Sequence, residues 1–150
     1  MKTHQTYVLD HASWSRVRVV TACRQVLDVF RPDAAIFECD IPIDDSEWPP
    51  EVQAAAQTLR VHAQTNGKRE RGGYAMTGVT PATHPTWPAF ATFCPFSYDA
   101  TVWDHQGRDL ISLADEATCF TLTLTHPQYQ ALTHLPDIPL VPLHTWRRTR

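Results

Sequence analysis

The chain has 150 residues, of which 43% are hydrophobic and 19% are charged, and its formal net charge is −3. This length suits one globular domain, which buries roughly 70% of the surface that its extended chain would expose. The small negative charge gives no general attraction to nucleic acids or to anionic membranes, so no direct binding to either is expected.

The first residues predict a short strand followed by a long helix. TYVLD at 6–10 is β-like, and apolar residues then recur at helical spacing from about 13 to 30, with Ser13 as the expected N-cap. Pro32 ends the helix, because it disfavours a helical conformation at Arg31. The start has no apolar run of signal-peptide length, and no segment reaches the roughly 18 apolar residues of a membrane span, so a cytoplasmic protein is expected.

Residues 35–43 predict a strand with one buried side. Phe37, Cys39 and Ile41 alternate with Glu38 and Asp40, which are therefore expected on the exposed side. A second helix is predicted to begin at Pro49 and Pro50 and to end before Asn66-Gly67, with Asp45 or Ser46 as its cap.

The second half of the chain predicts a meander preceded by an irregular section. Residues 66–78 are expected to form a basic loop that leads to a short strand, and 81–96 hold four prolines and four aromatics, with one helical turn near 87–92. Three hairpin-connected strands are predicted between 99 and 125, followed by a short helix at 127–134 and an extended tail at 136–150.

This order of elements predicts one α+β domain over residues 1–150. Its sheet is expected to be mixed or mainly antiparallel with about five to six strands, two main helices on one face, and a C-terminal three-stranded meander. The four cysteines fall mostly in apolar patterns, which favours free thiols, although their even number leaves disulfides open.

The common catalytic signatures are missing. The chain has no C-x-x-C, H-E-x-x-H, G-x-S-x-G, P-loop or G-x-G-x-x-G, and His126 and His134 lack the spacing of a structural zinc site. The sequence therefore favours a protein without catalytic activity, and no cofactor is expected.

One alternative is a site for Mg²⁺ or Mn²⁺. Asp10, Glu38 and Asp40 would supply the oxygen ligands that phosphodiester hydrolysis requires if their two strands were neighbours. TYVLDHASWS, about ten residues, resembles the strand-Asp-helix opening of PIN-domain nucleases, and this resemblance implies a metal-dependent nuclease. The further acidic positions of that family have no clear counterparts here.

The main functional hypothesis comes from the acidic stretch FECDIPIDDSEWPPE at 37–51, which contains no Lys, Arg or His. A helix N-terminus accounts for much of its second half, because negative charge is favoured there, but not for Glu38 and Asp40. An acidic surface with a central Trp suits a basic protein partner. We therefore expect an inhibitor of immunity or antitoxin type that covers a basic effector such as a nuclease toxin. The expected partner-binding residues are Glu38, Asp40, Asp44, Asp45, Glu47 and Trp48.

Two further features leave weaker alternatives. The aromatic residues of 81–96 would line a pocket in a small-ligand-binding regulatory domain, but they are interpreted first as core residues. The small basic clusters at 68–71 and 147–150 are interpreted as a solvated loop and tail, because neither contains a good aromatic platform for nucleic acid.

Overall fold

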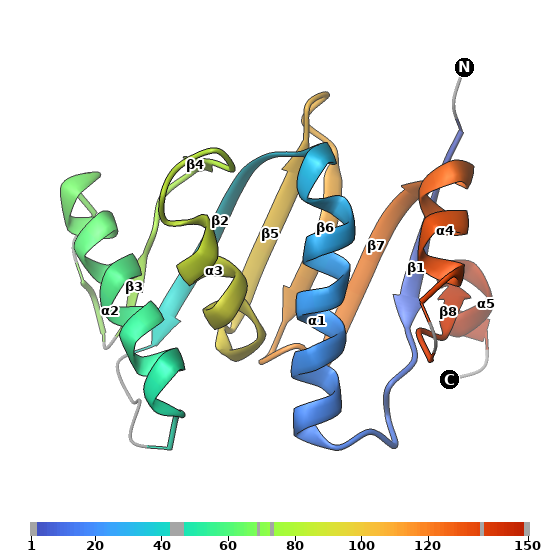
Figure 1. The fold of residues 1–150 in the computed structure, drawn as a ribbon, viewed down its shortest axis with the longest axis horizontal. Helices are drawn as coiled ribbons and strands as arrows, with labels where there is room; N and C mark the ends of the chain where they lie inside the picture. The colour runs from blue at the N-terminus through green and yellow to red at the C-terminus, as the bar shows by residue number, and fades with distance from the viewer. Residues whose placement is uncertain (1–2, 43–46, 69, 73, 136, 149–150) are drawn as a thin grey trace.

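The computed structural model describes residues 3–42, 47–68, 70–72, 74–135 and 137–148, in which one sheet is covered on one face by helices (Figure 1). The strands are β1 His4–Leu9, β2 Ala34–Pro42, β3 Tyr74–Met76, β4 Thr80–Pro81, β5 Asp99–Asp104, β6 Asp109–Ala114, β7 Cys119–Thr125 and β8 Leu140–Pro142. The helices are α1 Arg16–Phe30, α2 Pro50–Thr65, α3 Trp87–Phe93, α4 His126–Thr133 and α5 Leu143–Arg148, and short 3-10 turns follow α1 and α3.

The α+β class, the single sheet and the meander β5–β6–β7 are confirmed. The expected strand number is wrong, since the described residues form eight strands. The excess comes from β4 and β8, which have only two or three residues each, too few for an alternating pattern to reveal. Strand β3 is the short strand expected after the basic loop. The tail beyond 136 was expected to be extended throughout, but it contains β8 and α5.

The strand order is β3-β2-β5-β6-β7-β1-β8, and β4 also pairs with β2. All of the pairings are antiparallel, so β1 and β2, which lie four steps apart, run in the same direction. Helix α1 carries the chain from one to the other across the sheet, and the meander fills the space between them (Figure 1).

Helix α1 begins two residues later than the sequence suggested. The N–H of Trp14 donates to the carbonyl of His11 at 2.9 Å, which closes a turn before the helix. Ser15 then has an extended backbone with ψ 156°, and its hydroxyl accepts the N–H of Arg18. Ser15 is therefore the N-cap, and the expectation of Ser13 is wrong.

Helix α2 has the predicted bounds. Its N-cap residue is Pro49, which offers no capping side chain. Asp45 and Ser46, the expected caps, lie outside the described residues. At its other end, the N–H groups of Asn66, Gly67 and Lys68 donate to the last carbonyls of the helix. Gly67 has φ +73°, a conformation in which glycine carries no steric cost, and it ends the helix as expected.

The core lies between the sheet and helices α1–α4. One row of side chains crosses five strands in register and is almost fully buried: Phe37, Val102, Ile111, Leu122 and Tyr7. Trp87 and Phe90 of α3 pack on Phe37, with ring centroids 5.7 and 4.3 Å away. The interpretation of these aromatics as core residues is thus confirmed.

The next row faces the opposite side of the sheet and is mostly polar: Glu38, Thr101, Ser112, Thr121 and Val8. No helix of the described residues lies over β2, β5, β6 or β7 on this side, which we call the open face. At its far end Val8 is only 4% exposed, and Trp146 of α5 lines the same small cavity. The described helices include none that is long and apolar enough to cross a membrane.

Candidate functional site

The three carboxylates of the expected metal site do not come together. Asp10 follows β1, whereas Glu38 and Asp40 lie on β2, and three strands stand between them. At about 4.8 Å per strand, this separation is roughly 19 Å. The described residues contain no group of three His, Cys, Asp or Glu side chains that would hold a metal ion. The assumption that the two strands are neighbours is therefore wrong.

Asp40 is a structural residue. It is 7% exposed, so the expectation of an exposed side chain is wrong for this position. Its carboxylate accepts the backbone N–H groups of Tyr98 at 2.8 Å and Asp99 at 3.1 Å, as well as the hydroxyl of Ser97. These donors occupy one carboxylate oxygen and hold the start of β5 against β2.

Glu38 lies on the open face as expected, half-buried, with Thr101 opposite it on β5. Of the other predicted contacts, Asp44 and Asp45 lie outside the described residues. Glu47 is exposed, and Trp48 is half-buried, with its ring against Phe93 at a centroid distance of 5.2 Å. Trp48 thus packs against α3.

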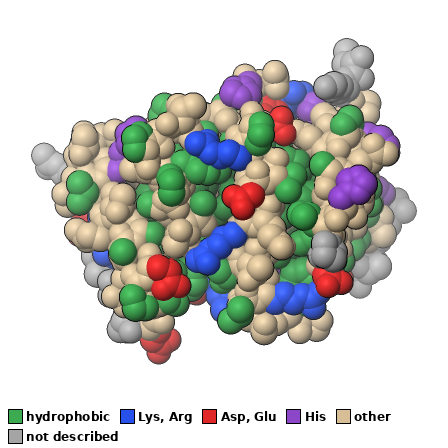
Figure 2. All heavy atoms as spheres, viewed as in Figure 1, with side chains coloured by type: hydrophobic (Ala, Val, Ile, Leu, Met, Phe, Trp, Pro, Cys, Tyr) green, Lys and Arg blue, Asp and Glu red, His purple; other side chains and the backbone are tan. Residues whose placement is uncertain are grey.

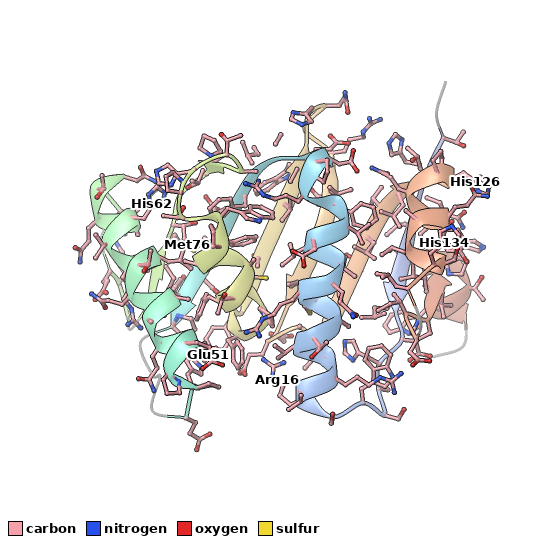
Figure 3. All side chains as sticks on the ribbon, viewed as in Figure 1. Arg16, Glu51, His62, Met76, His126 and His134 are labelled. Carbon is pink, nitrogen blue, oxygen red and sulfur yellow. The ribbon has the colours of Figure 1, made fainter. Side chains whose placement is uncertain are left out.

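The strands and the helices differ in the charges that they carry. Helix α1 carries Arg16, Arg18 and Arg24, and Figure 2 shows several Lys or Arg side chains across the helix-covered side. The described strands contain no Lys or Arg, and all of their charged residues are acidic: Glu38, Asp40, Asp99, Asp104 and Asp109. Glu51 belongs to the first turn of α2 on the helix side (Figure 3). The acidic residues of the sheet therefore extend beyond the stretch at 37–51 to β5 and β6.

Three exposed or half-buried acids stand on the open face. Glu38 lies on β2, Asp99 begins β5 and Asp109 begins β6. Burial, and then the nearby charge of Asp40, raise the pKa of Asp99. Burial is the larger cause, and the smaller contribution of Asp40 is a repulsion between two carboxylates that a nearby cation would relieve.

Trp103 is a feature of the open face that sequence reasoning missed. It pairs with Ile36 on β2 and with Asp109 on β6, and it is half-buried. The alternation of DATVWD could have revealed it, because Val102 points into the core and Trp103 must then point to the other side. Trp103 places a large aromatic surface beside carboxylates in the way that Trp48 was expected to do.

The largest cavity, about 580 Å³, lies at the opposite end of the sheet from Asp99 and contains an internally satisfied charge pair. The guanidinium of Arg108 bonds the Asp104 carboxylate at 3.1 Å and also contacts His4 Nδ1 at 3.2 Å. Burial acts to raise the pKa of Asp104, but hydrogen bonds from Arg108 and Gln106 outweigh it, and the pKa is lowered. The described residues that line this cavity do not include a nucleophile that is hydrogen-bonded to a general base.

The cysteines do not form a reactive centre. All four are free thiols, and Cys23, Cys39 and Cys94 are buried. Burial raises the pKa of each of these three thiols, that of Cys23 to about 12, so they remain protonated and inert. Cys119 is exposed on the open face.

Comparison of the chain with protein-family profiles, with curated proteins and with solved structures finds no match. The functional argument therefore depends on the open face itself.

Proposed function

We propose that this protein is a non-enzymatic inhibitor of immunity or antitoxin type, which covers a basic protein partner such as a nuclease with the open face of its sheet. The observation that carries this proposal is the absence of Lys and Arg from all described strands, whose charged residues are five carboxylates. Opposite charge across an interface raises the association rate and excludes wrong partners.

The chemistry of the open face supports the same conclusion. Thr101, Ser112 and Thr121 form a row of hydroxyl side chains on this face, and Trp103 adds one large aromatic side chain between Ile36 and Asp109. Trp is enriched among the residues that dominate binding energy, and it acts best near the centre of a patch. The buried row of core side chains packs behind the meander and supports the face from the other side of the sheet.

Two readings from the sequence lose their structural basis. A metal-dependent nuclease requires the Asp10, Glu38 and Asp40 cluster, which does not form. A ligand pocket walled by residues 81–96 requires accessible aromatics, but Trp87, Phe90 and Phe93 are buried in the core.

The test compares two triple charge reversals with the same change in net charge. The first replaces Glu38, Asp99 and Asp109 with Lys, and the matched control replaces the exposed acids Asp28, Glu51 and Glu70, none of which lies on a strand. Each tagged chain is used to isolate partners from extracts of its native host, and each partner's enzymatic activity, beginning with nuclease activity, is assayed with and without the chain.

We expect a basic protein to be retained and inhibited by the parent chain and by the control, but to be lost with the open-face variant. Trp103→Ala should weaken the same complex with little change in its salt dependence, because it removes contact area and no charge. The proposal is refuted if the open-face variant retains every partner, or if the retained partner keeps its full activity.

A further inference from the structure

A second site lies at the β3 edge of the sheet, where Tyr74 and Met76 pair with Pro42 and Asp40 of β2. Gly67, Lys68, Arg71, Tyr74 and Met76 line a cavity of about 370 Å³, which is within the size range of small-ligand pockets. The cavity lies between the turn that follows α2 and strand β3. Figure 3 labels Met76, which lies on the α2 side of the molecule.

The two cations of this cavity differ in their contacts from the other cations that the structure describes. Six other Arg side chains whose surroundings are described have a hydrogen bond or an aromatic ring contact: Arg16, Arg18, Arg24, Arg31, Arg60 and Arg108. Within the described ranges, the side chains of Lys68 and Arg71 have neither, and no carboxylate pairs with them. An anionic ligand would supply the missing partner for both.

The backbone holds both cations in place. A Cβ at Gly78 would lie 3.0 Å from Cε and 3.7 Å from Cγ of Lys68, so the stem of Lys68 lies directly on the glycine backbone. The N–H of Lys68 also donates to the carbonyl of Ala63 at 2.9 Å. Lys68 therefore projects from a defined position, because its backbone is bonded and its stem is in contact along its length.

The backbone of Arg71 is paired with that of Tyr74. The backbones of Arg71 and Tyr74 bond each other in both directions, at 3.0 and 3.2 Å, which closes a tight turn before β3. Tyr74 is 45% exposed, and Met76, two residues along, lies on the same face of the strand. The ring of Tyr74 therefore provides an aromatic platform next to the basic cluster at 68–71, which contains none itself.

The C-terminal end of α2, which carries a partial negative charge, does not repel an anion in this cavity. The last carbonyls of the helix already accept the N–H groups of Asn66, Gly67 and Lys68. Their partial charges are therefore largely satisfied, and the positive charge of Lys68 and Arg71 dominates the cavity.

We propose that this cavity binds a mononucleotide, with the phosphate between Lys68 and Arg71 and the base against the ring of Tyr74. Lys and Arg are the side chains that bind phosphate, and aromatic side chains stack bases of any sequence. The assignment does not depend on the proposed inhibitor function, since Glu38, Asp99, Asp109 and Trp103 do not line this cavity.

The test titrates the full chain separately with the four ribonucleoside monophosphates, adenosine and inorganic phosphate, and follows backbone amide shifts by NMR. We expect saturable shifts with at least one monophosphate at residues 66–68 and 71–76, and much weaker binding of adenosine and of phosphate alone. Lys68→Ala and Arg71→Ala should each weaken binding about tenfold or more, because each removes a charge-assisted contact. Tyr74→Ala should weaken the nucleotide and leave phosphate unchanged, whereas Tyr74→Phe keeps the ring and should bind like the parent.

Arg18→Ala is the matched control, since it removes a cation from α1 and should leave the affinity unchanged. Competition with a single-stranded oligonucleotide tests whether the natural ligand is a free nucleotide or a nucleotide within a polymer. If it is part of a polymer, the oligonucleotide should bind more tightly than the monophosphate. The proposal is overturned if no monophosphate shifts these residues at millimolar concentration, if adenosine binds as tightly as its monophosphate, or if the Lys68 and Arg71 variants retain the affinity of the parent.

Discussion

Replacing Asp40 with Ala should destabilise the protein much more than replacing its neighbour Glu38, although both carboxylates belong to one strand. The Asp40 carboxylate accepts the N–H of Tyr98 at 2.8 Å, the N–H of Asp99 at 3.1 Å and the hydroxyl of Ser97. Glu38 lies half-buried on the open face, and within the described part of the molecule its carboxylate has no hydrogen-bond partner.

The expected loss of folding free energy depends on which hydrogen-bond donors lose their acceptor. The N–H of Asp99 keeps a longer contact of 3.3 Å to Ser97 Oγ, and the Ser97 hydroxyl keeps the carbonyl of Asp99 at 2.8 Å. The N–H of Tyr98 is left without an acceptor, at a cost of about 1–3 kcal/mol. Loss of the weaker contacts adds to this cost, and relief of the repulsion between Asp40 and Asp99 subtracts from it. We therefore expect a loss of stability of about 2 kcal/mol for Asp40→Ala and of less than about 0.5 kcal/mol for Glu38→Ala.

Urea denaturation followed by circular dichroism measures the difference. For a slope of about 2 kcal/mol/M, Asp40→Ala should lower the midpoint by about 1 M with an unchanged slope. Asp40→Asn serves as a control of shape, because its side-chain carbonyl still accepts a hydrogen bond, and it should fall between the parent and the Ala variant. Equal midpoints for the two Ala variants would refute the structural role given to Asp40.

Three other predictions follow from local contacts. Ser15→Ala should cost about 1 kcal/mol in urea denaturation and Ser13→Ala almost nothing, since only Ser15 caps α1; the reverse order would contradict this cap. Burial and then a neighbouring histidine lower the pKa of His62, so the unfolded chain binds the proton first. The stabilising contribution of His62 is complete above pH about 6.5 and is lost as the pH falls below it, by at most about 1.4 kcal/mol per pH unit. Denaturation at several pH values should therefore show that the stability of His62→Gln changes less steeply with pH than that of the parent. Asp40→Asn should lower the pKa of Asp99 towards its ordinary value, as measured by NMR titration of the carboxyl carbon; an unchanged pKa would mean that Asp40 does not influence it.

The elements that the sequence predicted well are those with long periodic patterns. The apolar residues of α1 and the alternation of β2 and β7 define both the element and its buried face, because they repeat over several turns or strand periods. Strands β3 and β4 lack such a pattern, since they are short and are defined by pairing with β2.

The candidate surface was only partly predictable. The acidic character of the stretch at 37–51 pointed to β2, but the open face also takes Asp99 and Asp109 from β5 and β6. Those residues join Glu38 only through the strand order, which places β5 next to β2 and β1 four strands away. A single sequence carries no signal for that order. Because the strand order was unknown, a metal site between Asp10 and β2 could also be suggested.

The pairing of β1 also determines when the sheet can be completed. His4 pairs with Thr125 and Val8 with Thr121, so β1 and its partner β7 are separated by more than about 110 residues of chain. At about 5–20 residues per second, the ribosome needs roughly 6–22 s to make that length. During this time Tyr7, Val8 and Leu9 have no strand to join. Closure of the sheet by β1 is therefore a late event in biosynthesis, and this apolar strand is the segment of the nascent chain that most needs protection from premature pairing.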